Sequence, residues 1–133
     1  MHITNKIATL WVVVLFNMAF ADIVGFAAPG AIEDIMALGT DGANFGSVEG
    51  VAITPVFLVI AGVFIELSIL MIYLSKSLPR KINRIANSVV AVLTGVFIIG
   101  GGSATPHYIF FASFEVAALF FIVMNVWGWT EDE

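Results

Sequence analysis

Apolar residues run in four long stretches along the chain, and short polar segments separate these stretches. A helix that crosses the hydrocarbon core of a bilayer needs about 20 mostly apolar residues. Each of the four stretches has this length, so we expect four membrane-spanning helices. Their approximate ranges are 7–28, 54–74, 82–101 and 106–129.

Proline, threonine and glycine mark the ends of the predicted helices. Thr54-Pro55 and Thr105-Pro106 each place a capping hydroxyl before a proline at the first helical position, where the missing N–H costs nothing. Pro29-Gly30 closes the first span. Gly100-Gly101-Gly102 closes the third span with residues that tolerate a left-handed backbone. These signals predict an all-α membrane fold, a single four-helix bundle over residues 1–133.

The connection between the first two spans, about residues 30–53, is the longest one. Its opening places Ile32, Ile35 and Met36 on one helical face behind two acidic residues. This pattern is typical of a short helix that lies in the membrane interface, with an ordered loop as the alternative. Residues 39–46 predict a turn region that could cover an outward-facing cavity. Asp41, Asn44 and Glu49 do not match a calcium-binding pattern, so we expect no metal there.

Composition agrees with lipid as the surrounding solvent. Hydrophobic residues make up 60% of the 133 positions and charged residues only 11%, which is too apolar for a small soluble domain. The chain has no cysteine, which excludes disulfides, thiolate metal sites and cysteine nucleophiles. With only five Lys and Arg residues, nucleic-acid binding is not expected.

The basic residues predict the orientation of the spans. Lys6 precedes the first span, and the other four surround the second connection: Lys76, Arg80, Lys81 and Arg84. With four spans, these two regions lie on the same side of the membrane. The positive-inside rule makes this side cytoplasmic, so we expect both termini in the cytoplasm.

Three acidic residues lie deep inside the predicted spans: Asp22, Glu66 and Glu115. No Lys or Arg occurs at that depth, because Arg84 lies at the start of the third span. A charged acid at a helix centre costs about 2.5–3.5 kcal/mol on insertion scales, so three unpartnered acids would cost on the order of 7–10 kcal/mol. Salt bridges within the membrane are excluded because no basic partner exists there. The carboxyls are therefore protonated, line a water-filled cavity, or bind a cation that comes from outside.

The rise of an α-helix predicts the depth of these acids. Counted from the outer ends of the spans, Asp22 lies roughly 10 Å deep, Glu115 roughly 13 Å and Glu66 roughly 16 Å. Asn17 reaches a depth similar to that of Glu66. We therefore expect two polar layers, Asp22 with Glu115 above Asn17 with Glu66. The mouth of this ligand-binding site would carry the two remaining candidates, His107 and Tyr108.

Spacings of three and four residues indicate which helix faces point inward. The expected stripes are Gly62, Glu66, Ile69 and Tyr73 on the second span, Asn83, Asn87, Ala91 and Thr94 on the third, and Tyr108, Ala112, Glu115, Ala118 and Ile122 on the fourth. Small and hydrogen-bonding residues also serve ordinary helix packing in membranes, and we prefer that interpretation for the asparagines and Thr94. For the three acids we prefer a functional cavity, because acids are costly packing residues.

Several short strings occur along nearly the whole chain: Leu10-Trp11, Phe16-Asn17-Met18, Phe20-Ala21-Asp22-Ile23, Thr54-Pro55, Asn83-Arg84-Ile85-Ala86-Asn87, Gly100-Gly101-Gly102 and His107-Tyr108-Ile109-Phe110-Phe111. Together they resemble an uncharacterised family of small prokaryotic four-span membrane proteins, similar in layout to DoxX-like proteins. The resemblance implies the four-span fold and supplies no activity. We expect a multi-pass protein of the prokaryotic cytoplasmic (inner) membrane.

Three functions fit the acidic residues. The leading hypothesis is a binding or transport protein with an acidic, outward-opening pocket for a proton, a metal ion or an organic cation. One alternative is a membrane enzyme that acts on a hydrophobic small molecule by carboxyl proton transfer. Aromatic residues would suit such a ligand, although they also commonly face lipid: Phe64, Phe110, Phe111, Phe114 and Trp11. The other is a structural or accessory subunit with protonated, hydrogen-bonded acids.

The expected partners are the lipid bilayer and a small-molecule or cation ligand. One four-helix protomer is small for alternating access, so we also expect a homo-oligomer. The sequence assigns no cofactor, no metal ligand and no catalytic residue.

Overall fold

The computed structural model describes residues 1–37, 46–48 and 51–130. In chain order the elements are α1 (Ile3–Gly25), α2 (Ala31–Met36), β1 (Gly46–Val48), β2 (Val51–Ile53), α3 (Pro55–Ser77), α4 (Arg80–Gly101) and α5 (Pro106–Gly128). Most of the turn predicted for residues 39–46 lies outside the described residues, as do Asp41, Asn44 and Glu49.

Four helices within the described residues, α1, α3, α4 and α5, are long and apolar enough to cross a membrane. This confirms the predicted all-α four-helix membrane fold. The helix ends differ from the prediction by a few residues. α1 begins at Ile3 because the Nδ1 of His2 accepts a hydrogen bond from the Thr4 backbone N–H at 3.3 Å and caps the helix. α3 continues to Ser77, three residues beyond the predicted end.

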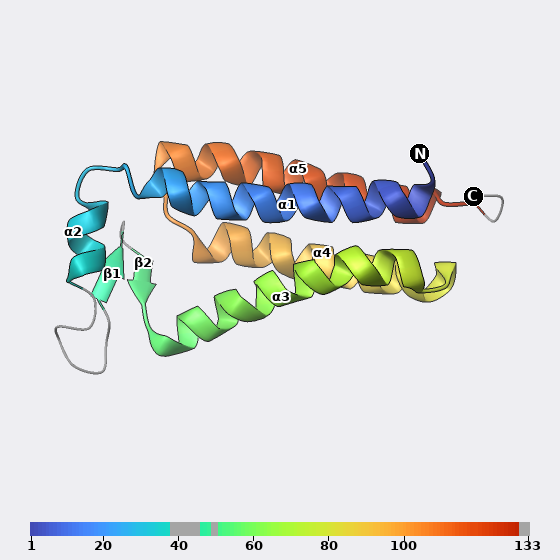
Figure 1. The fold of residues 1–133 in the computed structure, drawn as a ribbon, viewed down its shortest axis with the longest axis horizontal. Helices are drawn as coiled ribbons and strands as arrows, with labels where there is room; N and C mark the ends of the chain where they lie inside the picture. Colours follow the sequence, from blue (N-terminus) through green and yellow to red (C-terminus); the bar gives the residue numbers. More distant parts are fainter. Residues whose placement is uncertain (38–45, 49–50, 131–133) are drawn as a thin grey trace.

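The first connection contains more regular structure than the sequence predicts. α2 forms the expected short helix and follows Gly30, whose φ of 84° suits glycine. β1 and β2 pair as antiparallel strands with Val48 opposite Val51. Each strand has three residues, which is too short for a recognisable alternating pattern. These elements lie together at the end of the bundle away from the two termini (Figure 1).

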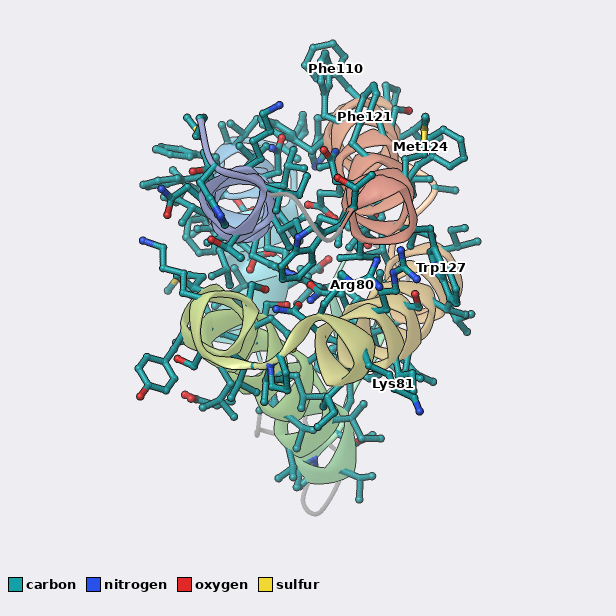
Figure 2. All side chains as sticks on the ribbon, turned by 90° about the vertical axis from the view of Figure 1, so that its right-hand side faces the viewer. Arg80, Lys81, Phe110, Phe121, Met124 and Trp127 are labelled. Atoms are coloured by element: carbon teal, nitrogen blue, oxygen red, sulfur yellow. The ribbon has the colours of Figure 1, made fainter. Side chains whose placement is uncertain are left out.

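The four long helices form a ring when viewed along the bundle (Figure 2). α1 packs between α3 and α5, and α4 closes the ring on the other side. The start of α1 and the end of α5 lie at the same end of the bundle (Figure 1), and Arg80 and Lys81 lie at that end as well (Figure 2). Lys6 at the start of α1 and Lys76 in the last turn of α3 also belong to this end, which we call the basic end.

A buried polar network joins α1, α3 and α4 in the half of the bundle near the basic end. The Trp11 indole N–H donates to Oδ1 of Asn87 at 2.7 Å, and the Ser75 hydroxyl donates to the same oxygen at 3.3 Å. The Asn83 amide donates to the Ser75 backbone carbonyl at 2.8 Å and accepts from the Asn87 amide. All four side chains are fully buried. Because polar groups are costly to leave unpaired in an apolar interior, the network holds these three helices in register.

Two arginines satisfy the last carbonyls of α5. Arg84 donates to the carbonyl oxygens of Val126 at 2.9 Å and Trp129 at 2.8 Å, and Arg80 donates to Trp129 at 3.0 Å. The Arg84 guanidinium also lies 5.4 Å from the centre of the Trp127 ring. Cations therefore meet the negative end of the helix dipole, which fixes the end of α5 against the start of α4.

The inward faces of α4 and α5 were predicted well, and that of α3 was predicted wrongly. The α4 stripe of Asn83, Asn87, Ala91 and Thr94 is buried, as are Glu115, Ala118 and Ile122 of α5. On α3 the buried residues are Ser68, Met71 and Ser75, whereas Glu66, Ile69 and Tyr73 are exposed. Apolar residues lie on all sides of α3, so they do not mark its inner face. Ser75 bonds to Asn87 of α4, whereas the buried Ser68 bonds to the Phe64 carbonyl of its own helix.

The network yields a stability prediction. Asn87→Ala removes the acceptor of the Trp11 indole N–H and leaves this buried donor unpaired. We expect the free energy of unfolding to fall by about 1–3 kcal/mol, measured by reversible unfolding in mixed micelles. Asn125→Ala is the matched control, because the Asn125 amide bonds only to Phe121 O of its own helix at 2.7 Å. Equal losses in both variants would contradict the role of the network.

Candidate ligand-binding cavity

A cavity of about 530 Å³ lies in the half of the bundle opposite the basic end. All four long helices contribute to its walls, and the first connection contributes Ala31, Ile35, Val48 and Ile53 at its outer end. Pockets for small molecules usually measure about 300–1,000 Å³, so the cavity has the size for a small ligand.

The N-terminal half of α3 forms one wall of this cavity. α3 diverges from the other long helices toward its N-terminal end (Figure 1). Phe57 and Phe64 of α3 and Phe97 of α4 line the resulting space. The Phe97 ring centre lies 4.6 Å from that of Phe64 and 6.3 Å from that of Phe57. The wall between α3 and α4 is therefore aromatic, with ring faces and edges available to a ligand.

Two of the three intramembrane acids lie at this cavity. Glu115 of α5 is 3% exposed, and no described residue donates a hydrogen bond to its carboxyl group. Asp22 of α1 is exposed and lines the same cavity. The two carboxyls are close enough to interact electrostatically, and no Lys or Arg lines the cavity. The cavity therefore has an acidic interior.

Tyr108, which the sequence predicts at the mouth of the site, lines the cavity. Its ring lies against Gly102. Its hydroxyl donates to the Ile98 backbone carbonyl of α4 at 2.8 Å. A Cβ atom on Gly102 would overlap the Tyr108 ring. Gly102 has φ of −102° in an extended backbone, so the predicted reason for the glycine, a left-handed end of the third span, is wrong at this position. The close approach of the ring requires glycine there.

His107 also lies at the cavity, half-buried beside the start of α5. Its Nε2 lies 3.3 Å from the hydroxyl of Thr105, which lies 2.8 Å from the hydroxyl of Ser103. The Thr105 side chain makes no hydrogen bond to the helix backbone, which corrects the predicted cap. The cap predicted at Thr54 is formed, with its hydroxyl accepting from the Phe57 N–H at 3.0 Å.

The predicted lower polar layer of Asn17 and Glu66 is not formed around the cavity. Neither residue lines it. The Asn17 amide donates to the Val13 carbonyl of its own helix at 2.9 Å. Glu66 is exposed on the outer face of α3. Both positions follow from the rotation of their helices, since Ser68, Met71 and Ser75 occupy the inner face of α3.

Aromatic residues were only partly assigned from the sequence. The aromatic residues considered for an apolar ligand were Phe64, Trp11, Phe110, Phe111 and Phe114. Of these, only Phe64 lines the cavity. Trp11 belongs to the buried network, and Phe110 and Phe114 are exposed. Phe57 and Phe97 were missed, because an apolar helix carries aromatic residues on every face and only the neighbouring helices show which of them meet.

Four long apolar helices define a small α-helical membrane protein, and the cavity at one end of the bundle is lined mainly by apolar residues together with Asp22 and Glu115. The chain belongs to a family of unknown function, DUF6326, whose model matches residues 2–133. No curated protein and no solved structure matches the chain. The family match covers nearly the whole chain, as the resemblance implies, whereas the DoxX-like layout stays a prediction.

The contact between Gly102 and Tyr108 yields a second prediction. Gly102→Ala forces the Tyr108 ring away from the turn and breaks its hydrogen bond to Ile98. We expect a loss of about 1–3 kcal/mol in the free energy of unfolding, as for other overpacked sites. Gly100→Ala is the control, since nothing lies within 4 Å of a Cβ atom there. A Gly102→Ala protein as stable as the control would show that the ring is not confined by this glycine.

Proposed function

We propose that this protein is a membrane-embedded binding protein of the transport type, whose ligand is an organic cation with an apolar part. The observation that carries the proposal is Glu115, a carboxyl group that is 3% exposed, receives no hydrogen bond from a described residue and lines a cavity of about 530 Å³. A buried acid in a membrane span points to a functional site.

The charge of the cavity supports a cationic ligand. Glu115 and Asp22 line the cavity together, and the lining contains no basic Lys or Arg. The Tyr108 hydroxyl, which could otherwise donate to a carboxylate, donates to the Ile98 carbonyl instead. A ligand with positive charge would give the Glu115 carboxyl a partner and would interact favourably with Asp22 as well.

The walls of the cavity support an organic cation over a metal ion. No group of three or more His, Cys, Asp or Glu side chains in the described part of the chain could hold a metal ion. The walls are mainly apolar, and the rings of Phe57, Phe64 and Phe97 meet there. Aromatic faces attract organic cations, and apolar surface binds their hydrocarbon groups.

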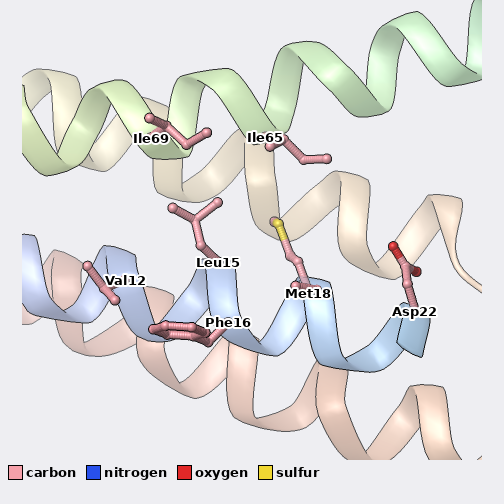
Figure 3. A pocket seen from close by; sticks show the side chains of 8 residues that line it. Val12, Leu15, Phe16, Met18, Asp22, Ile65 and Ile69 are labelled. Atoms are coloured by element: carbon pink, nitrogen blue, oxygen red, sulfur yellow. The ribbon is translucent and has the colours of Figure 1, made fainter. Parts of the chain in front are cut away.

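A groove between α1 and α3 supports a ligand with an apolar tail. This second hollow of about 390 Å³ shares Met18, Asp22 and Ile65 with the cavity. Leu15 and Met18 of α1 face Ile65 and Ile69 of α3 there, with Asp22 at one end (Figure 3). Among the described residues, Asp22 is the one acidic residue that lines the groove. We infer that the charged group binds at Asp22 and Glu115 while the tail lies along this groove.

Binding of a lipophilic cation tests the proposed function. The full chain in lipid nanodiscs should bind tetraphenylphosphonium in excess of empty nanodiscs, measured by equilibrium dialysis with labelled compound. Because both carboxyls attract the charge, the Asp22→Asn and Glu115→Gln double variant should bind at least tenfold more weakly, as expected when two close charge interactions of about 1 kcal/mol each are lost.

Two controls make the binding result specific. Glu66→Gln removes an acid that lies outside the cavity and should bind the cation as the unmodified protein does. An uncharged molecule of similar size and shape, such as tetraphenylsilane, should show no binding above that of empty nanodiscs. Equal binding by the double variant, or equal binding of the uncharged compound, would overturn the proposal.

We also propose that the basic end faces the cytoplasm of a prokaryotic cell, so that the cavity lies toward the outer side of the inner membrane. The positive-inside rule supports this orientation. The chain has no cysteine, so Ser77→Cys at the basic end and Ala104→Cys at the other end give unique labels. In intact cells an impermeant maleimide should label only Ala104→Cys. Labelling of Ser77→Cys alone would show that the protein has the opposite orientation in the membrane.

A further inference from the structure

Glu66 is the intramembrane acid that the cavity does not use. It lies eleven residues from both ends of α3, roughly 16 Å from either end, which is close to the middle of the membrane. Its side chain is exposed, and it has no hydrogen bond or ion pair with a described residue. An acid that faces hydrocarbon at this depth is costly and requires a partner.

Other polar side chains near the outer faces of the bundle are satisfied by their own helices. Asn17 donates to Val13 O, Ser113 donates to Ile109 O and Asn125 donates to Phe121 O, at 2.9, 2.8 and 2.7 Å. An ionised carboxyl cannot do the same, because it only accepts hydrogen bonds. In the middle of a helix the backbone N–H groups are already paired. An ionised Glu66 therefore needs a hydrogen-bond donor from outside this protomer.

The residues around Glu66 form a stripe suited to pairing with another helix. Val59, Val63, Glu66, Leu70 and Tyr73 are all exposed and follow each other at steps of four and three residues. This spacing is the heptad pattern by which helices pack along a common seam. α3 also has the least buried apolar window of the four spans, 11% against 28–33%. We call these five residues the α3 seam.

We propose that the α3 seam binds the same seam of a second copy of this chain, about a two-fold axis along the membrane normal. A two-fold axis brings each residue near the axis onto its own equivalent. Glu66 would then meet Glu66 of the second copy, and the two carboxyls would share a proton, with the protonated one donating to the other. Paired carboxyls in proteins hold a shared proton in this way.

The chemistry of the chain favours a second copy as the occupant. No Lys or Arg lies in the membrane interior of the chain, so contact between copies cannot neutralise Glu66 by a salt bridge. A hydrogen-bonded pair of carboxyls needs no basic residue, and two-fold symmetry supplies both members. Glu66 does not line the cavity. An experiment can therefore reject the proposed dimer without rejecting the proposed cation binding, and the reverse also holds.

Disulfide cross-linking of the full chain tests this interface. Because the chain has no cysteine, Val63→Cys places a single thiol on the seam. Val92→Cys is the matched control, because Val92 is exposed on α4 at a similar depth. Val92 lies nine residues from the C-terminal end of α4, and Val63 lies eight residues from the N-terminal end of α3. In liposomes at low protein-to-lipid ratio, oxidation should give at least fivefold more covalent dimer with Val63→Cys.

Substitutions of Glu66 in the Val63→Cys protein test the carboxyl pair itself. Glu66→Gln should keep the cross-link, because amide groups can also pair across the axis. Glu66→Leu should lower the association constant on the order of tenfold, which is the effect of losing a hydrogen bond between membrane helices. Glu66 is exposed, so neither variant should disturb the fold or the binding of tetraphenylphosphonium.

Three results would overturn the inference. They are equal cross-linking of Val63→Cys and Val92→Cys, a cross-link that Glu66→Leu leaves unchanged, and single-step photobleaching of the labelled protein in most vesicles. The last result would mean that lipid or a different membrane protein covers the seam. Loss of cation binding without loss of the cross-link would reject only the proposed function.

Discussion

The hydrocarbon core of a membrane contains no water that could hydrogen-bond to polar groups. A polar side chain inside these four helices therefore needs a hydrogen-bond or ionic partner from the protein or from a ligand. This constraint divides the bundle into two halves. Near the basic end, Trp11, Ser75, Asn83 and Asn87 satisfy one another in a closed and fully buried network. In the opposite half, Glu115 is buried beside a cavity, and no described residue donates a hydrogen bond to its carboxyl group. The first half stabilises the bundle, and the second contains the cavity in which we propose that a ligand binds.

α5 connects these two halves. Its C-terminal carbonyls are held by Arg80 and Arg84 of α4. Its N-terminal half carries Glu115 and Tyr108, and the Tyr108 hydroxyl bonds to the end of α4. The helix is therefore attached to α4 at both ends, which fixes Glu115 in the cavity wall. On the other side α3 diverges from the bundle, and this divergence makes room for the cavity (Figure 1).

The four spans could be predicted from length and hydropathy, and the stripe on α4 from its asparagines, because polar residues at helical spacing reveal an inner face. The same reasoning failed on α3. There Glu66 was taken to mark the inner face, yet Ser68 and Ser75 occupy it. In lipid both faces of a helix can be apolar, so hydrophobic periodicity does not orient such a helix. The contact between Trp11 and Asn87 spans 76 positions, and no local pattern predicts which helices become neighbours.

Among the candidate site residues, Asp22, Glu115, His107 and Tyr108 meet at one cavity, because each lies in the half of its helix opposite the basic end. Depth could be predicted from the helical rise, whereas rotation about the helix axis could not, and this separates Glu66 and Asn17 from the rest. The account depends on a cation that meets the Glu115 carboxyl directly. Infrared difference spectra of the full chain, recorded on addition of tetraphenylphosphonium, test this contact. We predict a carboxyl band change that Glu115→Gln reduces, because only Asp22 then remains to contact the cation, and that Glu66→Gln preserves; a spectrum that Glu115→Gln leaves unaltered would contradict it.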